Sequence, residues 1–208
     1  MKTFLFQGDS ITDAGRNREN DAARGNGYPT LVSAELLFDY PGQFETINRG
    51  ISGNRIVDLY ARMKKDILHL RPDYLSILIG INDVWHEFAS IPNNVEDQKF
   101  RKIYDMLIEE IKEALPDIKI YILEPFVLRA SATEEHWDVF QREVPLRAQS
   151  ARWVAEKHHL TFIPLQEKLD ALCEVCPASY WLRDGVHPTA AGHELIAREL
   201  LKAVKKDI

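Results

Sequence analysis

The chain has 208 residues, of which 45% are hydrophobic and 28% charged, and its formal net charge at pH 7 is −6. These values are ordinary for a globular protein and exclude a disordered, collagen-like or disulfide-rich chain. The acidic balance argues against binding to nucleic acid, which requires a strong basic excess. No apolar run reaches the 18 residues of a membrane-spanning helix, so we expect no membrane association. The length fits one compact domain over residues 1–208.

The amino-terminal segment does not resemble a secretion signal. Its apolar stretch is too short and no small-residue cleavage site follows, so we expect a cytoplasmic protein. Cys173 and Cys176 have the spacing C-x-x-C, but no second pair completes a zinc site. We expect both to be buried free thiols.

Short apolar runs alternate with helical patterns along the chain. In chain order, the predicted elements are a strand at 3–7, a helix at 28–38, a strand at 44–48, a helix at 56–70, a strand at 74–79, a helix at 100–115, a strand at 118–123, a helix at 145–158, a strand at 160–163 and a helix at 193–204. The alternation predicts an α/β protein, a three-layer α/β/α sandwich with a five-stranded parallel sheet. Long loops are expected at Arg16–Gly27 and Pro125–Asp138.

Polar and glycine-rich segments follow the first three predicted strands. They are Gly-Asp-Ser at 8–10, Gly-Ile-Ser-Gly-Asn at 50–54 and Gly-Ile-Asn-Asp at 80–83, and a further segment, Asp-Gly-Val-His-Pro at 184–188, precedes the last helix. If the first strand lies between the second and third, as in the flavodoxin-like order, these loops converge on one crevice at the carboxyl edge of the sheet.

The residue types in these loops fit an acyl-transfer site. Ser10 is the candidate nucleophile, which is weak until a base removes its proton. His187 is the candidate base, because imidazole titrates near neutral pH. Asp184 lies three residues upstream and is the candidate that orients the imidazole.

Ester hydrolysis also needs donors for the negative charge that forms on the carbonyl oxygen. The candidates are the backbone N–H groups of Ser10 and Gly53 and the side-chain amide of Asn82. Trp85 and Arg16 are candidate substrate contacts. No His, Asp or Glu cluster has the spacing of a metal site, so we expect no metal and no cofactor.

Other polar residues in these loops have simpler interpretations. Asp9 is expected to accept a hydrogen bond from the nearby backbone, and Asp83 to stabilise a turn. His193 lies on the apolar stripe of the last predicted helix and is expected to be packed.

The four loops together resemble the SGNH, or GDSL, hydrolase family. Its naming residues occur in order as Ser10, Gly53, Asn82 and His187, and its Asp-x-x-His pair is matched by Asp184 and His187. The resemblance spans positions 8–188 and implies the flavodoxin-like SGNH hydrolase fold.

Three longer segments are similar to intracellular acetylxylan esterases, which remove acetyl groups from xylan fragments. They are Gly-Asp-Ser-Ile-Thr-Asp-Ala-Gly-Arg at 8–16, Gly-Ile-Asn-Asp-Val-Trp at 80–85 and His-Pro-Thr-Ala-Ala-Gly-His at 187–193. The resemblance implies a serine esterase that takes a small ester, an acetylated xylo-oligosaccharide, and it is compatible with a homo-oligomer. Two alternatives remain. One is a thioesterase or lysophospholipase of the same family, and the other is a catalytically silent sugar-binding protein, against which the intact Ser10, Asp184 and His187 argue.

Overall fold

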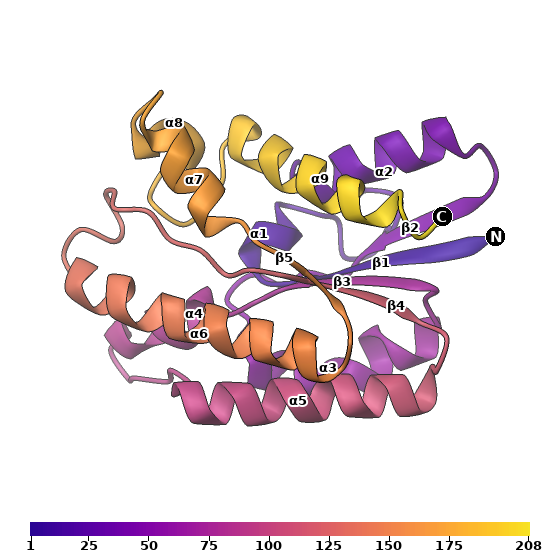
Figure 1. Ribbon diagram of the computed structural model, residues 1–208, viewed down its shortest axis with the longest axis horizontal. Coiled ribbons are helices and arrows are strands. Elements are labelled where there is room, and N and C mark those ends of the chain that lie inside the picture. Colours follow the sequence, from indigo (N-terminus) through magenta and orange to yellow (C-terminus); the bar gives the residue numbers. More distant parts are fainter.

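The computed structural model describes residues 1–208 and contains one parallel sheet with helices on both faces (Figure 1). The strands are β1 (Lys2–Gly8), β2 (Phe44–Asn48), β3 (Tyr74–Leu78), β4 (Lys119–Leu123) and β5 (Thr161–Ile163). All neighbouring strands are parallel, and their order is β2-β1-β3-β4-β5. The predicted three-layer sandwich and the central position of the first strand are therefore confirmed.

Helices of very different length connect the strands. They are α1 (Ser10–Asp13), α2 (Tyr28–Asp39), α3 (Ile56–Asp66), α4 (Ile81–Trp85), α5 (Asp97–Ala114), α6 (Trp137–Lys157), α7 (Gln166–Cys173), α8 (Ala178–Trp181) and α9 (Ala190–Val204), with single 3₁₀ turns at Leu68–Leu70 and His86–Phe88. Helices α2 and α9 cover one face of the sheet, and α3, α5 and α6 cover the other (Figure 1).

Side chains of the central strand alternate between two hydrophobic cores. Phe4 and Phe6 of β1 pack in the core under α2 and α9, whereas Leu5 packs in the core under α3 and α5. Successive residues of a strand point to opposite faces, so a strand covered on both sides needs apolar residues at both sets of positions. The same rule explains the almost continuous apolar run of β3, whose five residues are all buried.

The helix predicted at 56–70 ends at Asp66 and is followed by a 3₁₀ turn, and two larger differences from the predicted helices concern α6 and the short helices. Helix α6 begins at Trp137, eight residues before the predicted start, and contains Pro145 in its interior. Proline removes one backbone hydrogen bond, but α6 also buries Phe140, Val144 and Val154, and this packing offsets the cost. The short helices α1, α4, α7 and α8 were not predicted, because four to eight residues are too few to display a helical period.

The two cysteines are free, but they are half-buried and not buried as predicted. Cys173 is the last residue of α7, and the exposed Glu174 and Val175 follow it. The segment leaves the helix along the surface, which prevents the thiols from being enclosed. No three His, Cys, Asp or Glu side chains are grouped so that they could hold a metal ion, and none of the helices has the length and apolarity needed to span a bilayer.

A single arginine joins the loops at the carboxyl edge of the sheet. The guanidinium of Arg62, on α3, donates to the carbonyl oxygens of Gly8 (3.3 Å) and Arg49 (2.9 Å) and to Oδ1 of Asn54 (2.8 Å). It also forms an ion pair with Asp66 at 3.1 Å, and its side chain is only 14% exposed. Arg62 therefore connects the end of β1 to the two ends of the loop between β2 and α3.

A buried carboxyl connects the loop after β3 to the same region. Asp83, in α4, is completely buried and accepts the backbone N–H of Ile56, the first residue of α3, at 3.1 Å. Asp9, before Ser10, is also buried and accepts the N–H of Ile11 at 2.9 Å. Burial raises the pKa of Asp83 to about 8 and that of Asp9 to about 7, because a carboxylate loses its hydration in the interior.

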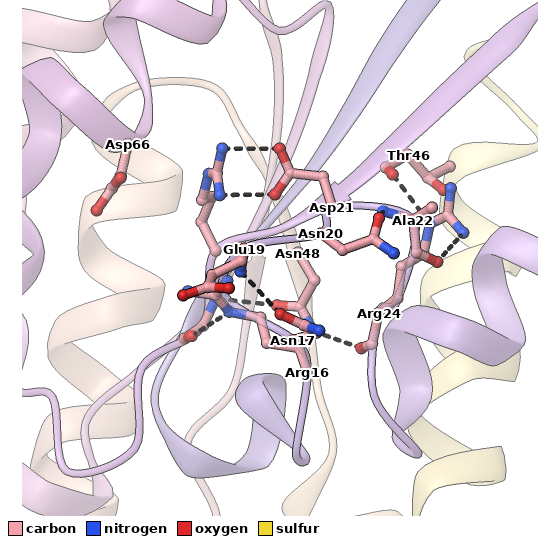
Figure 2. A network of polar contacts seen from close by, with 12 residues as sticks. Arg16, Asn17, Glu19, Asn20, Asp21, Ala22, Arg24, Thr46, Asn48 and Asp66 are labelled. Carbon is pink, nitrogen blue, oxygen red and sulfur yellow. Dashed lines mark hydrogen bonds and ion pairs between the residues drawn. The ribbon is translucent and has the colours of Figure 1, made fainter.

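The long loop between α1 and α2 has no helix or strand, as predicted, and is held by polar contacts (Figure 2). The side-chain amide of Asn48, at the end of β2, donates to the carbonyl oxygens of Thr12 (2.7 Å) and Arg24 (2.8 Å). Asp21 accepts two hydrogen bonds from Arg49 at 2.6 and 2.8 Å. These contacts attach the loop to the end of β2.

We predict that Arg62→Ala lowers the free energy of unfolding by about 1–3 kcal/mol, because it removes three hydrogen bonds and the ion pair with Asp66. The matched control is Arg198→Ala, whose side chain is 76% exposed and pairs only with Glu194 on the same helix. The control should change the free energy by less than about 0.5 kcal/mol. Urea denaturation measures both, and equal effects of the two variants would contradict the prediction.

A second prediction concerns the pH dependence of stability. Because the pKa of Asp83 is raised in the folded state, the folded protein holds a proton that the unfolded chain releases, and stability is lost as pH rises from about 4 to about 8. In the Asp83→Asn variant the side chain is an amide, which does not titrate in this pH range. Between pH 5 and pH 8 the variant should therefore gain stability relative to the wild type, as measured by urea denaturation. The control is Asp117→Asn, a substitution at an exposed aspartate. The prediction is wrong if the difference in free energy of unfolding between Asp83→Asn and the wild type is the same at pH 5 and at pH 8.

Candidate active site

Ser10, His187 and Asp184 form one continuous chain of hydrogen bonds. Ser10 is the first residue of α1, directly after the central strand, and its Oγ lies 2.9 Å from Nε2 of His187. Nδ1 of the same imidazole lies 2.7 Å from Oδ2 of Asp184. His187 and Asp184 come from the loop between α8 and α9, 177 residues from Ser10 in the case of His187. The three predicted catalytic residues are thus brought together by the fold.

The Asp184 carboxylate also organises its own loop. Its Oδ1 accepts the backbone N–H groups of Val186 at 3.0 Å and His187 at 2.8 Å. Burial by itself raises the pKa of Asp184, but the hydrogen bonds from the backbone and side chain of His187 and from Val186 together hold it below its usual value. Asp184 is therefore an anion near neutral pH.

This anion determines the tautomer of the imidazole. A carboxylate only accepts hydrogen bonds, so Nδ1 of His187 must carry the proton between them, and the lone pair of Nε2 then faces the Ser10 hydroxyl. An imidazole in this state can remove the hydroxyl proton as Oγ attacks a carbonyl carbon. The arrangement is chemically suited to nucleophilic acyl transfer.

Gly53 and Asn82 lie in the two neighbouring loops. Gly53 has a φ of +83° in the loop between β2 and α3, a conformation that favours glycine, and a Cβ atom at this position would meet no protein atom within 4 Å. Asn82, the second residue of α4, is 6% exposed, and its Nδ2 donates to the carbonyl oxygen of Asn54 at 3.1 Å. The second N–H of this amide is free to meet a ligand.

Two residues that support this region were not identified from the sequence. They are Asn54 and Arg62. The carbonyl oxygen of Asn54 accepts a hydrogen bond from the Asn82 amide, and Oδ1 of Asn54 accepts one from the Arg62 guanidinium. The contact between Asn82 and Asn54 joins two loops that only the folded sheet brings together. The contact between Asn54 and Arg62 joins a loop to the helix that follows it, and no sequence pattern indicates it.

The two candidate substrate contacts occupy different environments. Trp85 is half-buried, and its ring centroid lies 5.8 Å from that of His187 and 6.0 Å from that of Phe140. Arg16 is 9% exposed, and its Nε donates to the carbonyl oxygen of Gly50 at 2.7 Å (Figure 2). Trp85 therefore lies beside the proposed base, whereas Arg16 supports the loop after β2.

The Ser10 and His187 side chains open into a cleft of about 680 Å³. Its wall has no large aliphatic side chain and no Phe, Tyr or Trp, and it is formed by Ser10, Ala14, Gly15, Asn26, Ser52, Arg183, His187, Pro188, Thr189, Ala190 and His193. Neither Arg16 nor any carboxylate belongs to this wall. Arg183 and His193 belong to the wall, and neither was predicted to contact a ligand.

Comparison with known proteins relates this fold to ester hydrolases. The model of the GDSL-like Lipase/Acylhydrolase family matches residues 6–195. An acetylxylan esterase from Geobacillus stearothermophilus is 32% identical over an alignment of 208 positions, which covers 97% of this chain and 93% of that protein.

Solved structures give the same relationship. A protein from Parabacteroides merdae described as a GDSL-like lipase has a TM-score of 0.92 and 36% identity, with coverage of 98% of this chain and 95% of that chain. A catalytic mutant of the Geobacillus acetylxylan esterase has a TM-score of 0.86 and 30% identity, with coverage of 98% and 94%.

An α/β hydrolase from the metagenome of Lake Arreo has a TM-score of 0.87 and 30% identity, with coverage of 98% of this chain and 95% of that chain. The similarity therefore extends over nearly the whole chain in sequence and in structure. The chain belongs to the GDSL-like lipase/acylhydrolase family and is a carboxylic ester hydrolase.

Proposed function

We propose that the protein is a serine esterase that removes O-acetyl groups from xylo-oligosaccharides. The observation that carries this proposal is the hydrogen-bonded chain from Ser10 through His187 to Asp184, which opens into the cleft. The 32% identity to an acetylxylan esterase supports the acetyl group and the sugar. We further propose that residues 1–208 act as one domain and that the reaction uses only groups of this chain.

In the first half of the proposed reaction, Oγ of Ser10 attacks the acetyl carbonyl carbon while Nε2 of His187 takes the hydroxyl proton. The ionised Asp184 stabilises the imidazolium that results. Collapse of the tetrahedral intermediate breaks the bond to the sugar oxygen, which takes the proton from His187 and leaves as an alcohol. In the second half, His187 removes a proton from water as the water oxygen attacks the acetyl-serine. When the bond between the acetyl group and Oγ breaks, His187 returns this proton to Oγ of Ser10, and the released acetic acid ionises to acetate in water.

Negative charge on the former carbonyl oxygen requires donors that are already in position. We assign this role to the backbone N–H groups of Ser10 and Gly53 and to the free N–H of the Asn82 amide. The contact between Asn82 and Asn54 at 3.1 Å supports the assignment, because it fixes which way the amide points before the substrate arrives.

The cleft favours a small acyl group over a long chain. No Leu, Ile, Val, Met or Phe side chain lines its wall, whereas a thioesterase or lysophospholipase acting on fatty acyl groups needs an apolar channel. A silent sugar-binding protein would have no use for the aligned Ser10 and His187. We retain Trp85 as a proposed substrate contact because of its position beside the His187 ring, and Arg16 as a weaker one.

The proposed roles predict an order among variants in kcat for an acetyl ester. Ser10→Ala and His187→Ala should each reduce kcat to near background, and the double variant should lose little more, because the two residues act as a unit. Asn82→Ala should lose about 10²–10³-fold in kcat with a much smaller change in KM, since one donor of three is removed. Asp184→Asn should approach a loss of about 10⁴-fold, because the amide favours the wrong tautomer. If folded Ser10→Ala keeps more than about a tenth of the wild-type kcat, Ser10 is not the nucleophile.

Acyl chain length gives an independent prediction. Acetyl and octanoyl esters of the same phenol have equal leaving groups, so their ratio of kcat/KM reports on the acyl pocket alone. A cleft without large aliphatic side chains predicts a ratio above one in favour of acetyl. A preference for octanoyl would instead support the lysophospholipase alternative.

A further inference from the structure

A second histidine in the cleft has no role in the proposed reaction. His193 belongs to α9, which packs beside α2 (Figure 1), and it lines the cleft together with Ser10 and His187. Its side chain is buried except for 8% of the residue's surface. A buried imidazole at the wall of an active-site cleft is costly unless its polar atoms are used.

One ring nitrogen is occupied by the protein. Nδ1 of His193 accepts the backbone N–H of Tyr28, the first residue of α2, at 3.2 Å. A ring nitrogen that accepts a hydrogen bond carries no proton, so the proton of the neutral imidazole must lie on Nε2. Burial, with the nearby charges of Arg183 and His187, lowers the pKa of His193 to about 4, so the ring stays neutral at physiological pH.

The ring is also held in one orientation. A Cβ on Gly27 would lie 2.9 Å from Cε1 of His193, so glycine leaves just the space that the imidazole occupies. The Tyr28 ring also stacks with the imidazole, with centroids 6.4 Å apart and planes at 29°. The direction of the Nε2–H bond is therefore set before any ligand binds.

Nothing in the protein accepts this proton. Nε2 has no hydrogen-bond partner, and it is not among the atoms that are both unpartnered and sealed from solvent, so it is open to the cleft. Two hydroxyls of the wall have other partners, since Oγ1 of Thr189 donates to the carbonyl oxygen of Tyr180 at 2.6 Å and Oγ of Ser52 donates to Asp13 at 3.2 Å, and no hydrogen bond joins either of them to Nε2 of His193. No carboxylate lines the cleft. The wall offers a fixed donor that lacks an acceptor.

We propose that His193 is a substrate-binding residue whose Nε2–H donates a hydrogen bond to an oxygen atom of the sugar in the bound ester. This inference rests on the proposed function. An acetyl group has one carbonyl oxygen, which the three donors near Ser10 hold, and a methyl group, which accepts nothing. Only the alcohol part of the ester supplies a further acceptor, so His193 selects carbohydrate esters over esters of simple alcohols.

The test compares two acetyl esters that share the reacting group. One is an acetylated xylo-oligosaccharide, and the other is phenyl acetate, whose alcohol part has no hydroxyl or ring oxygen. His193→Phe keeps a planar ring but removes the donor. We expect kcat/KM for the sugar ester to fall by about three- to tenfold, the effect of one neutral hydrogen bond, mainly through a higher KM. For phenyl acetate kcat/KM should stay within about twofold.

Two further variants separate binding from structure. His193→Gln retains an amide donor and should recover most of the activity on the sugar ester. His69→Phe makes the same substitution at an exposed histidine outside the cleft and should change neither substrate. Loss of the contact with Tyr28 would weaken both reactions equally, so only a selective loss on the sugar ester supports the proposal.

The outcomes test the role of His193 separately from the proposed esterase function. Equal losses on both esters, or no loss on either, overturn the role of His193 and leave the proposed esterase intact. A wild-type protein that cleaves phenyl acetate but not the sugar ester overturns both the proposed substrate and this role. Should His193→Phe not fold, the Nε2–H proton resonance of His193 in Ser10→Ala provides the test. It should shift on addition of the acetylated xylo-oligosaccharide and not of phenyl acetate, and an unchanged resonance would overturn the proposal.

Discussion

The interactions of one half-buried arginine, Arg62, hold together the loops at the carboxyl edge of this sheet. Arg62 donates to a carbonyl oxygen at the end of β1, to another after β2 and to the Asn54 side chain. Each of these acceptors borders a loop that carries a proposed catalytic group. A backbone carbonyl that is removed from water needs a donor, and Arg62 supplies donors to three acceptors at once. The loops are consequently held relative to one another by a side chain that takes no part in the chemistry.

Two buried carboxyl groups next to the proposed oxyanion site lower the stability of the folded protein when they ionise. Asp9 and Asp83 flank the residues that form the proposed oxyanion site, and burial raises the pKa of both. Each accepts a backbone N–H at a helix start, so each contributes order to the loop next to it. Their raised pKa values indicate that the interior does not fully compensate a negative charge. Stability and the organisation of the site therefore oppose each other in these positions, as is common near functional sites.

The two histidines of the cleft illustrate how neighbouring groups set the properties of one side-chain type. Nδ1 of His187 donates a hydrogen bond to the Asp184 carboxylate, so its Nε2 presents a lone pair to Ser10. Nδ1 of His193 accepts a hydrogen bond from the backbone N–H of Tyr28, so its Nε2 presents a proton to the cleft. The same ring is thus suited to act as a base in one position and as a donor in the other, and the difference lies entirely in the partner of the second nitrogen.

Much of this protein is determined locally in the sequence. The apolar runs of the five strands and the residue types at Ser10, Asn82 and His187 need no knowledge of the fold, because strand burial and loop chemistry leave a local pattern. The tertiary structure alone decided the rest. Pro145 lies inside α6 because packing outweighs a lost hydrogen bond, and Arg62 and His193 acquire their roles from partners 54 and 165 residues away in the chain. No periodicity in the sequence predicts a hydrogen bond between residues so distant in the chain, so such a bond can be identified only in the folded structure.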